Sequence, residues 1–172
     1  MPLAFQPADD LYRGSGFDRG HLAAPAAVTW GDSPDAQIAM DQSFFLTNTT
    51  PQTAAFNQRS WQALEARERE VAAIRGRAVG ISGPVFAADD HDLGGVQVRG
   101  RLRSRGTFRV PRTFFKVVVA EGAGGELEVV SYELENAQEK ASPVAVSLEL
   151  LQARTGLVFP ESLHAARPLG GF

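Results

Sequence analysis

No glycine or proline interrupts the chain from Ala54 to Arg75, and this run is rich in Ala, Glu, Gln and Arg. These residues favour helix interiors, whereas glycine and proline weaken them. Gly76 follows directly and is a typical helix stop. We therefore predict one long helix over 54–75, around which the rest of the chain must pack. At about 100° per residue its core-facing side is expected to carry these apolar residues: Phe56, Ala63, Leu64, Val71 and Ile74.

Segments with β character lie on both sides of this helix. Gln42–Thr47 is an aromatic and β-branched run that predicts a short buried strand. Further strands are expected over 78–81, 83–86, 96–105, 108–120 and 127–134, the last two joined as a hairpin by 121–125. Ser147 can cap a short helix that ends at Gly156. This order favours a single α+β domain over residues 1–172 with a mostly antiparallel sheet.

Composition excludes several classes of protein. The 172 residues are 44% hydrophobic, which is enough for one core. The absence of cysteine excludes disulfide scaffolds, thiolate zinc sites and cysteine nucleophiles. No apolar run approaches the roughly 18–20 residues of a membrane-spanning helix, so no membrane partner is expected. A net charge of -3 argues against nucleic-acid binding through bulk charge but leaves local patches open. No secretory signal is recognised, and the compartment stays unassigned.

Chemically capable side chains are densest at Asp18-Arg19-Gly20-His21. In an extended segment Arg19 and His21 project to one face, and Asp18 and Gly20 to the other. An imidazole with a pKa of about 6.5 can take a proton from water at neutral pH, and the planar guanidinium suits phosphate oxygens. The pairing suggests phosphoryl chemistry. The plain structural alternative is a charged turn with a satisfied histidine.

A polar stripe climbs one side of the predicted helix at every fourth residue: Asn57, Trp61, Glu65 and Arg69. If this helix packs against the strand that carries His21, the stripe and the strand can form one site. The structural alternatives are a surface ion pair between Glu65 and Arg69 and a packing role for Trp61. Of the other histidines, His91 is expected in a solvated acidic loop, and His164 is interpreted as a surface residue without organised neighbours.

The motifs occur in a specific order: DRGHLAAPA (18–26), SFFLTNTTPQ (43–52), the helix stripe, GISGPVF (80–86), VPRTFFKVV (110–118) and TGLVFP (155–160). In this order they resemble the DNA/RNA non-specific endonucleases over most of the chain. The resemblance implies a ββα-metal active site built around the long helix. The first motif and the helical asparagine carry the resemblance, and the later motifs are supporting packing elements.

The resemblance implies roles for His21 and Asn57. His21 matches the general base that activates a water molecule for attack on the phosphodiester. Asn57 matches the single protein ligand of a magnesium ion, whose other positions are filled by water and phosphate oxygen. Magnesium is hard, prefers oxygen and keeps several waters, so one amide oxygen is enough. Manganese is the alternative metal, because a mostly hydrated site discriminates weakly.

Four more residues receive roles from the resemblance. Glu65 matches a carboxylate that orients metal-bound water, and Arg69 matches a positive group nearby. Within the signature itself, Arg19 is expected to aid transition-state charge. Asp18 is expected to hold local structure.

An arginine run is the candidate nucleic-acid contact: Arg99, Arg101, Arg103 and Arg105. On a continuous strand over 96–105 these side chains would share one face and present a ridge of positive charge. Such a ridge binds phosphates without sequence selectivity. Charges on an exposed strand serve equally well to prevent edge-to-edge pairing.

The N-terminus departs from the family pattern. Only 17 residues precede Asp18, whereas family members usually carry a longer region with an arginine that contacts the phosphate. We expect either an N-terminally truncated form or a substitute role for Arg13. An uncovered sheet edge would favour a homodimer.

The leading hypothesis is a metal-dependent, sugar-non-specific endonuclease with DNA and RNA as partners and a protein inhibitor as a further partner to test. One alternative is a catalytically weak or inactive family member that binds nucleic acid or a protein through the arginine run. Another is a metal phosphodiesterase with a small-molecule substrate.

Overall fold

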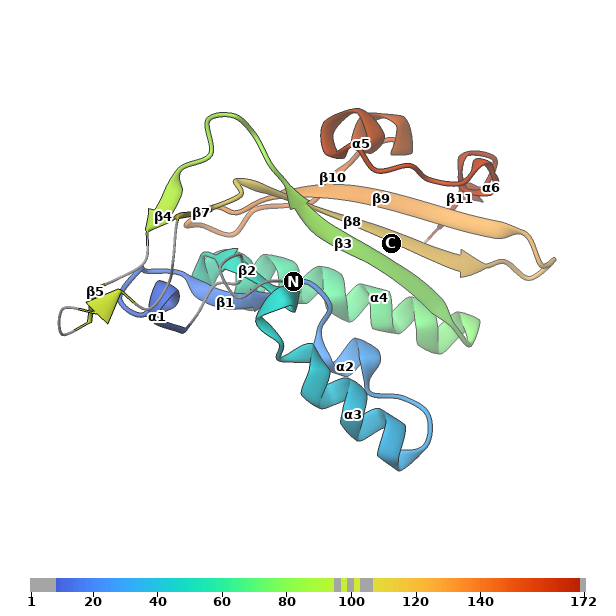
Figure 1. Ribbon diagram of the computed structural model, residues 1–172. Helices are drawn as coiled ribbons and strands as arrows, with labels where there is room; N and C mark the ends of the chain where they lie inside the picture. The colour runs from blue at the N-terminus through green and yellow to red at the C-terminus, as the bar shows by residue number, and fades with distance from the viewer. Residues whose placement is uncertain (1–8, 95–96, 99–100, 103–106, 171–172) are drawn as a thin grey trace.

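A five-stranded sheet separates two helical layers in the computed structural model, which describes residues 9–94, 97–98, 101–102 and 107–170 (Figure 1). The strand order is β10 (Val144–Ala145), β9 (Leu127–Glu135), β8 (Thr113–Glu121), β3 (Ala78–Val85), and β11 (Arg167–Pro168) also pairs with β9. Every pair in this sheet is antiparallel except β9 with β11. The predicted α+β class with a mostly antiparallel sheet is confirmed.

Strand β8 is buried on both faces of the sheet. One face packs against the long helix α4 (Gln62–Arg75), and the other against α5 (Leu148–Thr155) and α6 (Glu161–His164) (Figure 1). Phe114 and Val118 lie in the clusters on the α4 side, whereas Phe115 and Val117 pack under α5 and α6. This alternation is the period of two that a strand imposes.

The predicted hairpin of 108–120 and 127–134 is confirmed, with one interruption. β7 (Thr107–Arg109) ends before β8 begins at Thr113. Pro111 lies in the gap, and proline cannot donate to a strand ladder. The predicted C-terminal helix is also confirmed, since the Ser147 hydroxyl accepts a hydrogen bond from the Leu150 amide and α5 ends at a left-handed Gly156.

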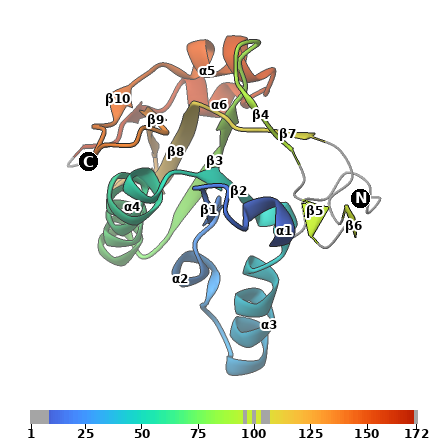
Figure 2. The same cartoon turned by 90° about the vertical axis from the view of Figure 1, so that its left-hand side faces the viewer.

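Strands β1 (Asp18–His21) and β2 (Thr49–Gln52) pair antiparallel beside the first turns of the long helix (Figures 1 and 2). Thr53 follows β2 and caps the helix, because its hydroxyl accepts a hydrogen bond from Phe56 N at 3.1 Å. Its carbonyl accepts another from Asn57 N at 2.9 Å. The two strands and the helix together form a ββα unit.

The long helix opens with a π-helical segment, η3 (Phe56–Trp61), before α4. A π turn holds one more residue than an α turn, so it shifts the phase of the preceding residues by about 100°. Phe56, Leu64 and Val71 are buried as predicted, but Ala63 is exposed and Ile74 is 74% exposed. The prediction for these two residues was wrong because it used one uninterrupted α-helical period. That period places Phe56 on the same side as Ala63 and Ile74, whereas the π-helical segment rotates Phe56 by about one residue toward the side of Leu64 and Val71.

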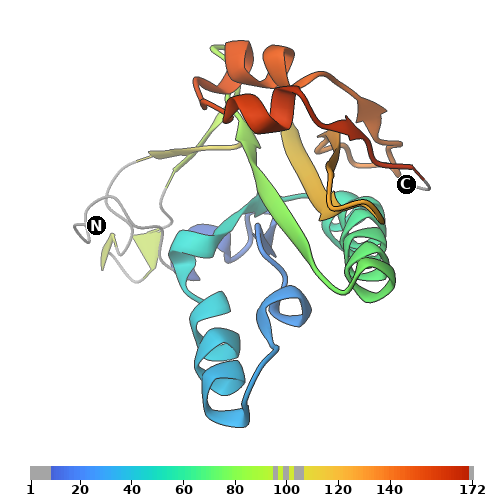
Figure 3. The same ribbon diagram turned by 90° about the vertical axis from the view of Figure 1, so that its right-hand side faces the viewer.

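Helices α2 (Pro25–Val28) and α3 (Ser33–Ser43) project from the α4 side of the sheet (Figure 3). The strand predicted over 42–47 is wrong: α3 extends to Ser43, the short helix η2 (Leu46–Asn48) follows, and the strand begins only at Thr49. Phe44 and Phe45 are 54% and 60% exposed. The physical reason is Asn48, whose side chain binds the backbone of Ala23 and Ser43 and holds a turn.

The single strand predicted over 96–105 is also wrong. β5 (Gln97–Val98) pairs antiparallel with β6 (Arg101–Leu102), so the chain reverses between them and alternate residues do not share one face. Next to them β4 (Asp92–Gly94) pairs with β7, and α1 (Asp9–Tyr12) lies near the N-terminus. Among the described helices, none has both the length and the apolar character to cross a membrane.

Candidate active site

The Asp18–His21 segment forms β1, as the extended reading predicted. The third residue of this strand, Gly20, must be glycine for a steric reason. A Cβ built on Gly20 would lie 2.0 Å from the Gln52 side chain, which crosses it from the paired strand and is fully buried. Only glycine leaves room for this side chain. The close approach fixes β1 against β2, and therefore against the helix that Thr53 starts one residue later.

Asp18 joins this strand to the helix. Its Oδ2 atom accepts hydrogen bonds from Asn57 Nδ2 and from Gln58 Nε2, each at 2.9 Å. A carboxylate only accepts hydrogen bonds, so it turns the amide nitrogen of Asn57 toward itself. The Asn57 amide oxygen accepts no hydrogen bond from a described residue and stays available as an oxygen ligand. An amide oxygen of this kind fits a hard divalent cation. Asp18 holds the local structure, as predicted, by fixing the orientation of the Asn57 amide.

His21 has the properties of a proton acceptor. Its Nε2 atom is shielded from solvent and has no hydrogen-bond partner among the described residues. The ring of Phe44 packs edge-on against the imidazole, with ring centroids 5.2 Å apart and an interplanar angle of 83°. Burial lowers the pKa of His21, and the nearby Arg19 charge lowers it further. The imidazole is therefore neutral at pH 7 and able to take a proton.

The segment that follows His21 is held by side chains that the sequence analysis did not identify. Asn48 accepts a hydrogen bond from Ala23 N at 3.1 Å, and its amide donates to Ala23 O at 2.9 Å and Ser43 O at 2.8 Å. The Ser82 hydroxyl donates to Leu22 O at 2.9 Å. Asparagine before a turn and serine in a strand were visible signals, but their partners Ala23 and Leu22 lie 25 and 60 residues away.

A second anchor holds the start of the helix. Asn136 accepts a hydrogen bond from Thr53 N at 2.8 Å and donates to Pro51 O and Pro111 O. The Thr53 hydroxyl donates to Ala137 O. Threonine ahead of a long helix is a capping signal, so Thr53 was detectable from sequence. Asn136 carried no local signal.

Glu65 is half-buried, and none of the ion pairs between described residues joins it to Arg69. The alternative interpretation as a surface pair is therefore wrong. Burial raises the pKa of Glu65 to about 7, even though the charges of Lys116 and Arg69 lower it. The predicted packing role of Trp61 is confirmed: it is fully buried and stacks on Phe56 with ring centroids 5.2 Å apart.

The structure brings together some of the predicted residues and not others. Asp18 meets Asn57 directly, Arg19 acts on His21 through its charge, and Arg69 acts on Glu65 in the same way. Among the described residues no hydrogen bond or ion pair joins His21 to Asn57 or to Glu65. Within the same ranges no three His, Asp or Glu side chains gather as a metal cluster.

The arginine run is only partly visible. Arg101 begins β6, whereas Arg99, Arg103 and Arg105 lie outside the described residues. The predicted ridge depended on one continuous strand, and the antiparallel pairing of β5 with β6 removes that basis.

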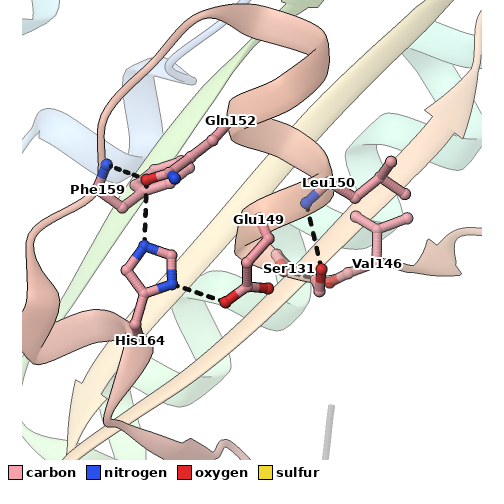
Figure 4. Close-up of polar contacts among 8 residues, drawn as sticks. Ser131, Val146, Glu149, Leu150, Gln152, Phe159 and His164 are labelled. Carbon is pink, nitrogen blue, oxygen red and sulfur yellow. Dashed lines mark hydrogen bonds and ion pairs between the residues drawn. The ribbon is translucent and has the colours of Figure 1, made fainter.

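Of the two histidine predictions outside the site, the one for His164 is wrong, whereas His91 is exposed, as the prediction of a solvated loop implied. His164 has organised neighbours: its Nδ1 atom lies 2.8 Å from Glu149 Oε1, and its Nε2 atom lies 3.1 Å from Gln152 Oε1 (Figure 4). Gln152 Oε1 also accepts a hydrogen bond from Phe159 N at 2.8 Å.

The acidic loop is ordered by Asp90, which is 8% exposed and accepts hydrogen bonds from Ala87 N and Arg112 N. In that loop His91 contacts the ring of Phe17, with ring centroids 5.7 Å apart.

Comparison with known proteins gives a consistent result. The family model for DNA/RNA non-specific endonucleases matches residues 2–166. Mitochondrial endonuclease G from Bos taurus is 37% identical over 158 residues, which cover 90% of this chain and 51% of that protein. Nuclease C1 from Cunninghamella echinulata var. echinulata is 32% identical over 171 residues, covering 96% and 66%.

A solved structure of the EndoG/EndoGI complex superimposes with a TM-score of 0.71 at 26% identity, covering 92% of this chain and 65% of the other. The chain thus spans about half the length of the endonuclease G relatives that it matches, since it covers 51% of the bovine and 52% of the human protein.

Proposed function

Because this chain belongs to the DNA/RNA non-specific endonuclease family, we propose that it is a metal-dependent nuclease that hydrolyses phosphodiester bonds in both DNA and RNA. The observation that supports this most directly is the pairing of two features in the ββα unit. One is a neutral His21 whose Nε2 atom has no partner among the described residues. The other is an Asn57 amide whose oxygen is left available by the hydrogen bond to Asp18.

His21 acts as the general base in this proposal. Its imidazole takes a proton from a water molecule while the water oxygen forms a bond to phosphorus. The bond from phosphorus to the leaving sugar oxygen breaks, and that oxygen receives a proton from a second water molecule. General-base catalysis of this kind contributes roughly 10²–10⁴-fold in rate. Arg19, on the same strand, stabilises the negative charge that develops on the phosphate.

Asn57 holds the metal ion in this proposal, and Asp18 orients its amide. A bound magnesium or manganese ion supplies Lewis-acid stabilisation of the phosphate charge. Glu65 orients water at the site, and Arg69 adds positive charge nearby. Because the pKa of Glu65 is about 7, its carboxylate gains and loses its charge within the physiological pH range.

The partners are nucleic acids and, by relation to the EndoG/EndoGI complex, a protein inhibitor. Arg99, Arg101 and Arg103 are proposed as contacts to the nucleic-acid phosphates on the ground of their charge alone, since the continuous strand that would align them is absent. The salt dependence of DNA binding after each is changed to Ala tests this proposal. A homodimer is tested by sedimentation of the purified chain.

The test is digestion of plasmid DNA and total RNA by the purified chain, with magnesium or manganese against EDTA. His21→Ala is the inactive variant, and His164→Gln is the matched control because His164 lies on α6, across the sheet from α4. We expect metal-dependent loss of both substrates with the wild type and the control but not with His21→Ala. A gel shift without cleavage would instead favour the nucleic-acid-binding alternative, and an unchanged rate in His21→Ala would refute the proposed base.

A further inference from the structure

A buried ion pair lies between the sheet and the helix that carries Glu65. Lys116, near the middle of β8, has a side chain that is only 2% exposed. Its ammonium donates a hydrogen bond to Glu68 Oε2 at 2.6 Å, and the Glu68 side chain is 14% exposed. The residues next to Lys116 on the same face of β8 are Phe114 and Val118, both fully buried. The ammonium is thus the exception on an apolar face.

Stability alone does not explain this pair. Removing two charges from water is costly, and replacing a buried ion pair by apolar residues of similar volume is often neutral or stabilising. The fold nevertheless makes room for it. A Cβ built on Gly80 would lie 1.9 Å from Glu68 Oε1, so β3 carries no side chain where this carboxylate lies. Three elements, β3, β8 and α4, are shaped around the pair.

The pair lies beside Glu65 on the helix. Lys116 Nζ contacts Glu68, three residues after Glu65, and sits 4.8 Å from the ring centroid of Trp61, four residues before it. Positions i-4 and i+3 lie on the same side of a helix as position i. The ammonium is therefore bracketed by the two helical neighbours of Glu65.

The charged groups that act on Glu65 are Lys116 from β8 and Arg69 and Glu68 from α4. Burial raises the pKa of Glu65 most strongly, the positive charges of Lys116 and Arg69 lower it, and the negative charge of Glu68 raises it by a smaller amount than Lys116 lowers it. Lys116 thus has the largest opposing influence on the Glu65 charge.

We propose that Lys116 is a positioning residue for the reaction: its buried ammonium, held between Glu68 and the Trp61 ring, places a fixed positive charge beside the stretch of helix that carries the Glu65 carboxylate. This inference rests on the proposed nuclease function. Lys116 itself touches no reacting atom. Its effect reaches the site through the charge of Glu65 and the position of α4.

The main test is the double variant Lys116→Met/Glu68→Gln, which removes both charges and keeps the side-chain volumes similar. The pH profile of kcat is measured with DNA, and the titration of Glu65 is followed by NMR of labelled carboxylates. We expect two changes: the fall of kcat on the acidic side of the pH profile and the midpoint of the Glu65 titration should both move to higher pH. At a pH below this fall, kcat of the double variant should then be lower than that of the wild type by about tenfold for each pH unit of the shift, and it should recover at higher pH.

The matched control is Arg75→Met/Glu128→Leu, which removes a second ion pair between α4 and the sheet, with an N–O distance of 2.8 Å. Arg75 lies ten residues beyond Glu65, about 15 Å along the helix. We expect no movement of either measurement in this control. An equal movement in it would overturn the assignment to Lys116.

Glu68→Gln alone should shift the Glu65 titration in the opposite direction. It keeps the ammonium and removes the negative charge that raises the pKa of Glu65, so the Glu65 titration should move to lower pH. This variant decides the question if the double variant does not fold. The NMR titration needs no catalysis and separates failure of this inference from failure of the nuclease proposal. An unmoved Glu65 titration in a folded variant would overturn the inference.

Discussion

Asp18 and Asn57, 39 residues apart in the chain, are joined by a hydrogen bond of 2.9 Å from the asparagine amide to the carboxylate. The bond connects the first strand of the ββα unit to the helix, and it turns the Asn57 amide nitrogen toward Asp18, which leaves the amide oxygen as the atom of the proposed metal ligand. Hydrogen bonds to a ligand residue often matter nearly as much as the ligand itself. The loss of Asp18 should therefore change the metal concentration that the nuclease activity requires.

Asp18→Ala is expected to raise the magnesium concentration for half-maximal activity by roughly 10–100-fold, because the Asn57 amide loses its fixed orientation. The measurement is nuclease rate against magnesium concentration. Gln58→Ala is the matched control, since Gln58 donates to the same carboxylate oxygen at the same distance but is exposed. A loss of rate with an unchanged magnesium requirement would contradict this role.

Gly20→Ala is expected to destabilise the protein by about 1–3 kcal/mol, because the new methyl group overlaps the buried Gln52 side chain. The free energy of unfolding is measured in urea. Gly20→Ala/Gln52→Ala should recover part of the loss, since the shorter side chain makes room. No recovery in the double variant would mean that the strain lies elsewhere.

Ile74→Ala should change the free energy of unfolding by no more than about 0.5 kcal/mol, because Ile74 is 74% exposed. Leu64→Ala, on the same helix, should cost about 2–5 kcal/mol, because Leu64 is 4% exposed. Urea unfolding of both variants tests the phase shift that the π segment introduces. Equal costs would support the uninterrupted helical period instead.

The contact of Glu149 with His164 predicts a pH-dependent stability. The pKa of Glu149 is lowered from 4.5 to about 2, by backbone hydrogen bonding first and by the Ser147 and His164 side chains next. A lowered pKa means that the unfolded chain binds the proton more readily. The contribution is therefore complete above pH 4.5 and is lost as the pH falls toward 2.

Glu149→Gln should remove this component. The free energy of unfolding of the wild type minus that of the variant should shrink between pH 5 and pH 2 and should also shrink at high salt, because the carboxylate is exposed. A difference that stays constant over this range would show that Glu149 does not act through its charge.

Much of the fold follows from local signals in the sequence. The uninterrupted run from Ala54 to Arg75 predicted the long helix, Ser147 and Gly156 bounded the last predicted helix, and the turn-rich segment 121–125 between two β-rich runs predicted the β8–β9 hairpin. Each of these depends on residues within one element. The motif order predicted the family, which the match over residues 2–166 shows.

Other features depended on contacts that no local pattern contains. The predicted strand over 42–47 is a turn because Asn48 binds Ala23, 25 residues earlier. The predicted strand over 96–105 is a strand pair, and a single period of two cannot reveal a reversal. His164 gained its neighbours because α5 and α6 pack side by side on the sheet.

The sequence by itself determined which residue types are present, where the helix and the hairpin form, and which family the chain belongs to. It also placed Arg19 and His21 on one strand and Asn57 and Glu65 on one helix. Only the tertiary structure decided that Asp18 orients Asn57, that Phe44 packs edge-on against His21 and that Lys116 lies between Glu68 and the Trp61 ring. The reason is physical: backbone propensity acts over a few residues, whereas orientation, burial and charge at a site come from side chains that meet only when the sheet and helix pack.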